Sequence, residues 1–312
     1  MSEKKQPIIS ASPKARKFAR ELGANIEKIR GSQRAGRVSE DDVKSFIKES
    51  FTKVIAKKEP EITSEKEIKE IQKYDHSEFG EVDIQPIPRI KKIARPHLVK
   101  SWTEIPHVTQ HDELDITEME QFRNSLRDIH TGEIVKTTPL SFIIRALVKA
   151  LIDFPIFNSS LDIANEKMIL KKYFHIGIAV DTKHGLMVPK VRNANNKNLN
   201  QLSEELKDIS DKCRNLKIDK KEFFGGSMTI TSLGGIGGYF FTPIINYPEV
   251  AILGVGRTYY KQVLINNEFQ KRNMLPLSLS YDHRIIDGAE AARFCNELKE
   301  NIGKNFAYRL AI

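Results

Sequence analysis

Three segments of the chain have the apolar period of an amphipathic helix. Thr138-Pro139 opens the first one with a capping threonine and a proline suited to the first helical position, and this helix is predicted to run to about Ile152. Residues 199–213 repeat their apolar positions with a helical period. Residues 287–302 predict a third helix, which ends at Gly303, a residue typical of helix C-termini.

Short runs of strand-forming residues lie between these helices. The runs are residues 168–180, 185–191, 228–233, 250–255, 259–265 and 275–281. Asn266-Asn267 separates two of them and predicts a hairpin turn. Because several strands follow one another through short turns, the pattern predicts an α/β domain with a mixed sheet over residues 79–312.

A separate helical pattern occupies residues 10–50. A first helix is predicted to begin after Ser12, to bury one apolar stripe and to stop at Gly23. A second helix is predicted to begin at Ser39, with Asp42 in the acidic position of a capping box. The stripe of the first helix consists of Ala15, Phe18, Ala19 and Leu22. The pattern therefore predicts a small all-α domain before the α/β domain.

The charge of the chain is concentrated in this first part. Of 50 Lys+Arg and 41 Asp+Glu, residues 1–58 hold 15 and 7, a net charge of +8 out of +9. A basic domain joined to a near-neutral one implies an acidic partner for the basic domain. Residues 51–78 are rich in Lys and Glu, which predicts a charged flexible linker, and residues 1–9 form an N-terminal tail.

Composition argues against several classes of protein. The chain has 312 residues, of which 40% are hydrophobic, but its apolar runs are too short to span a bilayer. Two cysteines, Cys213 and Cys295, are too few for a disulfide framework or a metal cage, and we expect both to be structural. The N-terminus lacks the apolar stretch of a signal peptide. We therefore expect a cytoplasmic protein with no metal and no membrane partner.

Four arginines of the basic domain are candidate partner-binding residues. Arg16 and Arg20 share one face of the first helix, and Arg34 and Arg37 flank Gly36 in the following loop. They either keep a small domain in solution, bind nucleic acid or bind an acidic protein surface. The pattern lacks the interleaved aromatic platform on which nucleic-acid bases stack, which disfavours a nucleic-acid partner.

The same segment resembles the peripheral subunit-binding domain of the 2-oxo acid dehydrogenase acyltransferases. The matching stretches are Ser-Pro-Lys-Ala-Arg-Lys-Phe-Ala-Arg-Glu-Leu-Gly at 12–23 and Gly-Arg-Val-Ser-Glu-Asp-Asp-Val at 36–43. The resemblance implies that these four arginines bind acidic side chains of dihydrolipoamide dehydrogenase or of the pyruvate-decarboxylating component. Guanidinium groups suit carboxylates on a partner surface, because they form paired hydrogen bonds with them.

Two motifs of the large domain have alternative chemical interpretations. The glycines of 234–238 would need a following helix to bind a dinucleotide, and Pro243 comes too early for one, so a tight turn is the better prediction. His107 and His111 could share a metal ion on a helix. Pro106 and the β-branched neighbours predict extended chain instead, with the two rings ~13 Å apart. We expect these histidines to serve in packing or substrate contact.

His283 is the candidate catalytic residue. It ends an apolar strand, where a rigid backbone holds a side chain well, and Asp287 follows four residues later. Histidine suits proton transfer near neutral pH. The residues alone leave two interpretations open: a catalytic base, or a satisfied polar residue at a strand end with Asp287 as a helix cap.

This stretch resembles a signature of the same acyltransferases. Asp-His-Arg-Ile-Ile-Asp-Gly at 282–288 matches their His-Arg-x-x-Asp-Gly motif, which chloramphenicol acetyltransferase shares. Further similar blocks are residues 105–109, 157–161, 176–181, 229–234 and 248–254. The resemblance implies a mixed-sheet catalytic domain like that of chloramphenicol acetyltransferase. Within the family, the blocks are most similar to the acetyl-transferring members that form cubic cores of pyruvate dehydrogenase complexes.

The resemblance implies acetyl transfer between the S8 sulfur of dihydrolipoamide and coenzyme A. His283 would be the general base, and a hydroxyl would stabilise the tetrahedral intermediate. The family usually has serine at the hydroxyl position, where this chain has Thr231, with Ser232 next to it as an alternative. Asp287 would hold the histidine loop through an ion pair with an arginine. The active site would lie between subunits of a homotrimer, within a core of 24 subunits.

No segment of the chain resembles a lipoyl domain. We therefore expect the lipoyl group on a separate polypeptide or on a domain missing from this chain. Three alternatives stay open: a non-catalytic core scaffold, for which the threonine at 231 would be a sign; the same chemistry with a succinyl or branched-chain acyl group; and a nucleic-acid binder that uses the basic domain.

Overall fold

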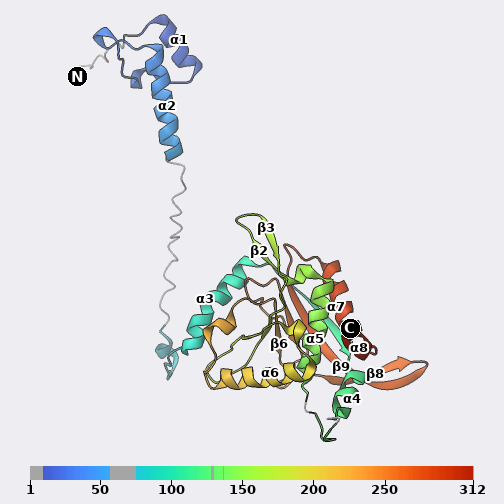
Figure 1. Cartoon of the computed structure of the whole chain (residues 1–312). Helices are drawn as coiled ribbons and strands as arrows, with labels where there is room; N and C mark the ends of the chain where they lie inside the picture. Colours follow the sequence, from blue (N-terminus) through green and yellow to red (C-terminus); the bar gives the residue numbers. More distant parts are fainter. Residues whose placement is uncertain (1–9, 57–74, 128–129, 136, 312) are drawn as a thin grey trace. The chain divides into compact units, whose positions relative to one another are not determined.

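The computed structural model describes residues 10–56, 75–127, 130–135 and 137–311. The chain divides into two compact units, Met1–Ile84 and Gln85–Ile312, whose elements are shown in Figure 1. The predicted tail and the central part of the predicted linker, residues 57–74, lie outside the described residues. In the described ranges, no helix has both the length and the apolar character needed to cross a membrane.

The first unit contains helices α1 (Pro13–Glu21) and α2 (Glu40–Ala56) with short 3₁₀ turns between them. The cap expected for α1 is present, because the Ser12 hydroxyl accepts the N–H of Ala15 at 3.1 Å. The cap of α2 is a reciprocal pair, in which Asp42 accepts the N–H of Ser39 at 2.8 Å. This hydrogen bond from Ser39, together with those from Ser32, holds the pKa of the Asp42 carboxyl well below its usual range. Helix α2 continues to Ala56, past residue 50, where the linker was expected to begin.

The second unit is an α/β domain. Its helices are α3 (Arg89–Glu104), α4 (Thr117–Ser125), α5 (Pro139–Asp153), α6 (Leu199–Arg214), α7 (Gly288–Ile302) and α8 (Phe306–Ala311). Its strands are β1 (His107–Asp115), β2 (Ser159–Asp162), β3 (Lys167–Leu170), β4 (Ile176–Ile178), β5 (Lys190–Val191), β6 (Met228–Ser232), β7 (Ala251–Val255), β8 (Tyr259–Ile265) and β9 (Glu268–Asp282).

Seven strands form one mixed sheet. Its order is β1-β9-β7-β6-β4-β5, and β8 pairs with the first half of β9. Strands β4, β6 and β7 run parallel to one another, whereas β1, β5, β8 and β9 pair antiparallel with their neighbours. Strands β2 and β3 form a separate two-stranded hairpin. The mixed sheet confirms the predicted fold class.

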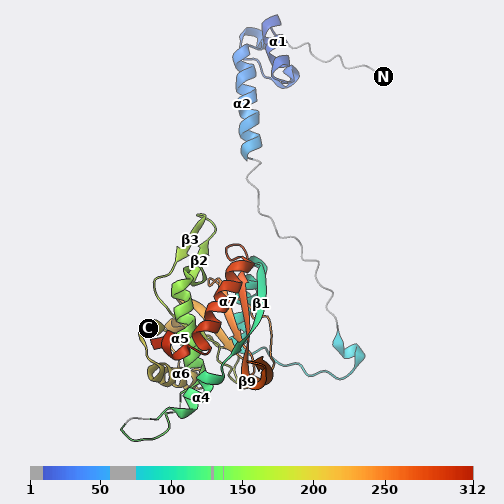
Figure 2. The same ribbon diagram turned by 90° about the vertical axis from the view of Figure 1, so that its right-hand side faces the viewer.

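Helices α5 and α7 pack side by side against one face of this sheet (Figures 1 and 2). The predicted start of α5 is confirmed, with Thr138 in the N-cap position and Pro139 at the first position. The Thr138 hydroxyl makes no capping hydrogen bond and lies 3.0 Å from the Ser141 hydroxyl instead. The core between helices and sheet contains Ile144 and Leu147 of α5, Phe294 of α7 and Leu253 of β7. The large core on this side fixes the sheet, and with it the strand ends that carry the candidate site.

The opposite face of the sheet carries a different set of side chains. Because residues alternate along a strand, Ile252 points away from the face that holds Leu253. Ile252 packs there with Ile105 and Ile245 in a small second cluster. The same alternation places Thr229 of β6 on this face, since its neighbour Ile230 belongs to the main core. This face therefore combines an apolar cluster with buried polar groups.

Candidate active site

His283 lies just beyond the last residue of β9, in the turn that leads to α7. Its backbone N–H donates to the carbonyl of Pro106 at 3.1 Å, which fixes the turn against the start of β1. The side chain is exposed, and its ring lies against that of Tyr281 at a centroid distance of 5.8 Å. Within the described residues, neither ring nitrogen has a hydrogen-bond partner. The imidazole is therefore available to a substrate.

The residues on either side of His283 form an ion pair. Arg284 donates from Nη2 to Asp282 Oδ2 at 2.5 Å and from Nε to Asp282 Oδ1 at 2.9 Å. Asp282 is 1% exposed, and its hydrogen bonds raise the pKa of Arg284 above its usual value. Asp282 also donates its N–H to the carbonyl of Val250 at 2.8 Å. Neither residue is a predicted site residue, although the opposite charges on either side of the histidine are visible in the sequence.

Asp287 is the N-cap of α7. Its carboxylate accepts the N–H of Glu290 at 2.7 Å, and Glu290 in turn accepts the N–H of Asp287 at 3.2 Å. This capping box is the alternative that the sequence left open. The ion pair between Asp287 and an arginine does not occur among the described residues of this single chain; the pair that closes the turn is Asp282–Arg284.

Thr231 lies on β6, on the same side of the sheet as Thr229, and is half-buried. Its hydroxyl has no hydrogen-bond partner in the part of the chain that the structure describes. The neighbouring Ser232 is exposed and points to the opposite face by strand alternation. Among the described residues the Ser232 hydroxyl has no partner either, so both hydroxyls are free to donate a hydrogen bond, and the two differ in the face of the sheet that they occupy.

One chain does not bring Thr231 and His283 together. Thr231 pairs with Gly254, and Gly254 pairs with Ser278 on β9. His283 lies five residues after Ser278, just beyond the end of β9, and two strands away from Thr231. At ~3.3 Å per residue and ~4.8 Å per strand, the two residues are roughly 19 Å apart. They cannot act on the same bond within a single chain.

His107 and His111 both lie on β1, as extended chain, and each has a polar partner. His107 donates from Nδ1 to the carbonyl of Ile105 at 2.8 Å and accepts the N–H of Ile245 at Nε2 at 2.9 Å. His111 Nδ1 lies 2.9 Å from the hydroxyl of Ser278. Both nitrogens of His107 are thus engaged in holding the backbone. Among the described residues, no cluster of three or more metal-ligating side chains occurs.

The remaining candidates have structural roles. The glycines of 234–238 form a turn in which the carbonyl of Leu233 accepts two N–H groups, and no helix follows them. Cys213 and Cys295 are both buried. Burial raises the pKa of the Cys295 thiol to about 12, so it stays neutral and is a poor nucleophile.

The four candidate partner-binding arginines of the first unit are all exposed. Arg16 and Arg20 lie on α1, Arg34 begins a 3₁₀ turn and Arg37 follows it. The turn is tight, because a Cβ on Gly31 would lie 2.3 Å from the carbonyl oxygen of Gly36. The close approach of these glycines keeps the arginine-bearing loop compact.

Two family models match the chain. The model of the 2-oxoacid dehydrogenases acyltransferase (catalytic domain) matches residues 79–308, and that of the e3 binding domain matches residues 9–44. The chain belongs to the 2-oxoacid dehydrogenase acyltransferase family. The resemblance inferred from the sequence is thereby confirmed in both parts of the chain.

Curated members of this acyltransferase family are similar over most of the chain. The dihydrolipoyllysine-residue acetyltransferase component of the pyruvate dehydrogenase complex of Cupriavidus necator is 45% identical over 289 residues, which are 91% of this chain and 52% of that protein. The component with the same name from Haemophilus influenzae is 42% identical and covers 92% of this chain and 52% of that protein. The chain thus spans about half the length of these relatives.

Solved structures of the family are also similar. The dihydrolipoamide acetyltransferase of Azotobacter vinelandii, studied for the role of a serine, a histidine and an asparagine in its catalytic mechanism, has a TM-score of 0.73 and 43% identity. It covers 77% of this chain and 98% of that chain. The structure of a cubic core of the pyruvate dehydrogenase multienzyme complex has a TM-score of 0.73 and 44% identity, with the same coverage.

Proposed function

We propose that this acyltransferase moves an acetyl group between the S8 sulfur of dihydrolipoamide and coenzyme A. The observation that carries the proposal is His283: an exposed imidazole with two unpartnered nitrogens, on a turn closed by the ion pair of Arg284 with the buried Asp282, inside the family's catalytic domain. The acetyltransferase names of the relatives support the choice of acyl group.

The mechanism follows from what a neutral imidazole does to a thiol. In the direction of acetyl-CoA synthesis, His283 accepts the proton of the coenzyme A thiol as its sulfur attacks the thioester carbonyl of acetyl-dihydrolipoamide. Such general-base help typically contributes ~10²–10⁴-fold. The tetrahedral intermediate then collapses, the bond to S8 breaks, and the imidazolium returns the proton to the leaving sulfur. The acetyl group passes directly between two thiols, and the protein supplies no nucleophile.

Thr231 is the proposed donor to the negative oxygen of this intermediate. Its unpartnered hydroxyl is suited to the task, although the methyl group of threonine restricts rotation about χ1. Because Thr231 lies roughly 19 Å from His283 in one chain, the donor must come from a second copy of the chain. We therefore propose a homotrimer in which His283 of one protomer faces Thr231 of the next.

The spacing of the residues studied in the Azotobacter vinelandii enzyme supports these assignments. There, the serine precedes the histidine by 52 residues, and the asparagine follows it by four. Thr231, His283 and Asp287 have the same spacings in this chain. Asparagine and aspartate are both good helix caps. We propose that Asp287 positions His283 by capping α7, rather than acting as an acid.

The first unit is proposed to recruit partners. Its match to the e3 binding domain supports binding of dihydrolipoamide dehydrogenase, and its exposed arginines suit acidic groups on that protein. Binding of the pyruvate-decarboxylating component is the finer proposal. The likeness to a solved cubic core supports assembly of the trimers into a core of 24 subunits. That the lipoyl group is carried by a separate polypeptide or a missing domain stays a prediction. The location of the protein in the cytoplasm also stays a prediction.

A comparison of acyl donors tests the proposal. The chain is incubated with free dihydrolipoamide and with acetyl-, succinyl- or isobutyryl-CoA, and release of free coenzyme A thiol is measured. Acetyl-CoA is expected to give the highest kcat/KM. A higher kcat/KM for succinyl- or isobutyryl-CoA would change the proposed acyl group but leave the proposed mechanism of transfer unchanged. No transfer from any donor by the folded assembly would favour a non-catalytic scaffold.

A further inference from the structure

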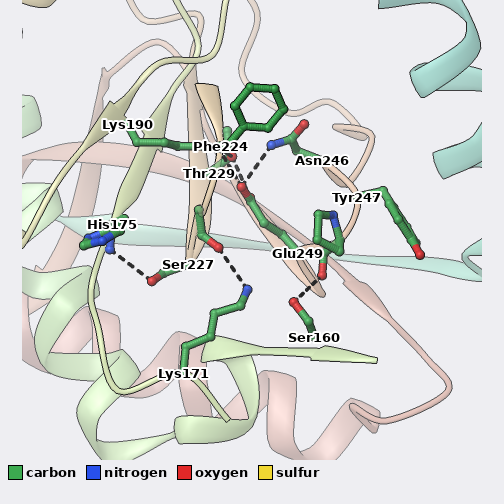
Figure 3. Close-up of polar contacts among 12 residues, drawn as sticks. Ser160, Lys171, His175, Lys190, Phe224, Ser227, Thr229, Asn246, Tyr247 and Glu249 are labelled. Atoms are coloured by element: carbon green, nitrogen blue, oxygen red, sulfur yellow. Dashed lines mark hydrogen bonds and ion pairs between the residues drawn. The ribbon is translucent and has the colours of Figure 1, made fainter. Parts of the chain in front are cut away.

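A buried ion pair lies on the face of the sheet away from α5 and α7. Lys190 of β5 donates to Glu249 Oε1 at 2.7 Å, and both side chains are 1% exposed. Thr229 of β6 donates its hydroxyl to the other carboxylate oxygen at 2.6 Å, and Asn246 donates to Oε1 at 2.9 Å. Figure 3 shows these side chains converging on Glu249. The carboxylate thus ties β5 and β6 to the segment that enters β7.

The backbone around this carboxylate is shaped to admit it. A Cβ on Gly226 would lie 2.2 Å from Glu249 Oε1 and 2.7 Å from Lys190 Nζ. A Cβ on Gly177 would lie 2.4 Å from the Thr229 hydroxyl. A second lysine, Lys171, donates to the carbonyl of Gly226 at 2.9 Å, and burial lowers its pKa to about 8. A side chain at either glycine would therefore collide with the groups that hold the carboxylate.

Stability alone does not account for such a pair. Removing two charges from water costs about as much as their attraction returns, so apolar side chains of similar volume often stabilise a fold equally well. Neither Lys190 nor Glu249 takes part in the proposed chemistry, since both are sealed from solvent. A buried pair of this kind can instead select one position for the segments that carry it.

The segment that Glu249 holds is in direct contact with the His283 turn. Glu249 is followed by Val250, whose carbonyl accepts the N–H of Asp282 at 2.8 Å. Asp282 is the residue before His283. The same segment is fixed at two other points: the carbonyl of Pro248 accepts the hydroxyl of Ser160 at 2.7 Å, and Ile245 donates to His107 at 2.9 Å. A shift of Glu249 would therefore move Val250 and, through one hydrogen bond, the turn of His283.

We propose that Glu249 is a positioning residue for His283: its carboxylate, held by Lys190, Thr229 and Asn246, fixes the 245–250 segment on which the catalytic turn rests. The proposal deepens the proposed acetyl transfer and rests on it. The Lys190–Glu249 pair is therefore expected to affect kcat rather than KM, because it contacts the 245–250 segment that supports His283 and does not contact the substrate.

Two matched double variants of the whole chain test this role. Lys190→Met with Glu249→Leu removes both charges and every hydrogen bond of the carboxylate. Lys190→Met with Glu249→Gln also removes both charges but keeps an amide that hydrogen-bonds Thr229 and Asn246. Acetyl transfer to free dihydrolipoamide gives kcat and KM, and mass spectrometry follows amide hydrogen exchange in peptides that contain residues 281–285. Thermal unfolding shows whether each variant is folded.

The leucine variant is expected to lose roughly 10–100-fold in kcat, with each KM within about 2-fold, because displacing a catalytic group by ~1 Å can cost ~10²-fold. Its 281–285 peptides are expected to exchange faster, and the glutamine variant to stay near wild type in both measurements. Wild-type kcat and exchange in both variants would overturn the proposal, as would equal losses in both with unchanged exchange.

A further variant tests the proposal if the Lys190→Met, Glu249→Leu protein does not fold. Thr229→Val removes only the hydroxyl that donates to Glu249, and it is expected to lower kcat about 3–10-fold at unchanged KM. A wild-type kcat for Thr229→Val would then overturn the proposal. If the wild-type chain itself transfers no acetyl group, the proposed function fails, while the hydrogen exchange of the two double variants still tests whether Glu249 positions the turn.

Discussion

At the scale of single residues, Thr231 is the most informative position. Its hydroxyl has no partner among the described residues, and loss of one oxyanion donor typically costs ~10²–10³-fold in kcat. Thr231→Ala is therefore expected to lower kcat by about 10²-fold with little change in KM, and Thr231→Ser to keep the activity. Ser232→Ala is the matched control and should be neutral. If Ser232→Ala rather than Thr231→Ala abolished transfer in steady-state assays, the donor would be Ser232.

Substitutions at Asp287 distinguish a helix-capping role of this residue from an electrostatic role. Asparagine caps helices about as well as aspartate, whereas alanine does not. Asp287→Asn is expected to keep stability and activity near those of the wild type, and Asp287→Ala to lose ~1 kcal/mol of stability through the cap of α7. Thermal unfolding and acetyl-transfer rates measure both. Equal loss of activity in the two variants would show that the negative charge is needed, as in the arginine ion pair expected from the sequence.

Residues in a short sequence motif could be predicted from the sequence, whereas pairs of residues far apart in the chain could not. His283 stands in a short motif that can be read directly. Lys190 and Glu249 are separated by 59 positions, and each is an ordinary charged residue in its own segment. Their pairing depends on the parallel order of β4, β6 and β7, which short-range patterns do not specify. The Lys190–Glu249 pair therefore cannot be predicted from local sequence patterns, whereas the charges of Asp282 and Arg284 lie two positions apart, close enough for such a pattern to show their pairing.

At the scale of elements, the first unit should act independently of the chemistry. Arg37 is exposed and lies far outside the catalytic match of residues 79–308. Arg37→Ala is expected to weaken capture of dihydrolipoamide dehydrogenase by about 10-fold, as loss of a charge-assisted hydrogen bond would. Calorimetric titration measures the capture, and acetyl transfer to free dihydrolipoamide should be unchanged. Unchanged capture together with salt-dependent retention on DNA would support the nucleic-acid alternative instead.

Helices with clear caps were predicted well. Thr138-Pro139 starts α5, and the Asp287–Glu290 box starts α7, each at the expected residue. Helix α3 was missed for two physical reasons. Pro96 lies inside it and interrupts the sequence pattern, and its large apolar residues are not on a buried stripe: Ile93 is 67% exposed and Trp102 64%. Because the apolar side chains of α3 are exposed in the single chain, they need not repeat with the helical period that packing against a core would impose.

At the scale of the whole molecule, the proposed active site requires more than one chain. A shared site makes a specific prediction for mixed assemblies of two inactive variants, His283→Ala and Thr231→Ala. In a trimer with head-to-tail contacts, some interfaces then combine an intact His283 with an intact Thr231. Equal co-expression is expected to restore up to about a quarter of the wild-type rate. A mixture no more active than either variant alone would place both residues' functions within one protomer.

His283 is the proposed base in an acetyl transfer between two thiols. The most direct measurement is the rate of transfer from acetyl-CoA to free dihydrolipoamide, with wild type beside His283→Ala and both shown to form the same oligomer. Clear activity is expected in the wild type, with a loss of at least ~10²-fold in kcat for the variant. Equal activity in the two proteins would contradict this role of His283.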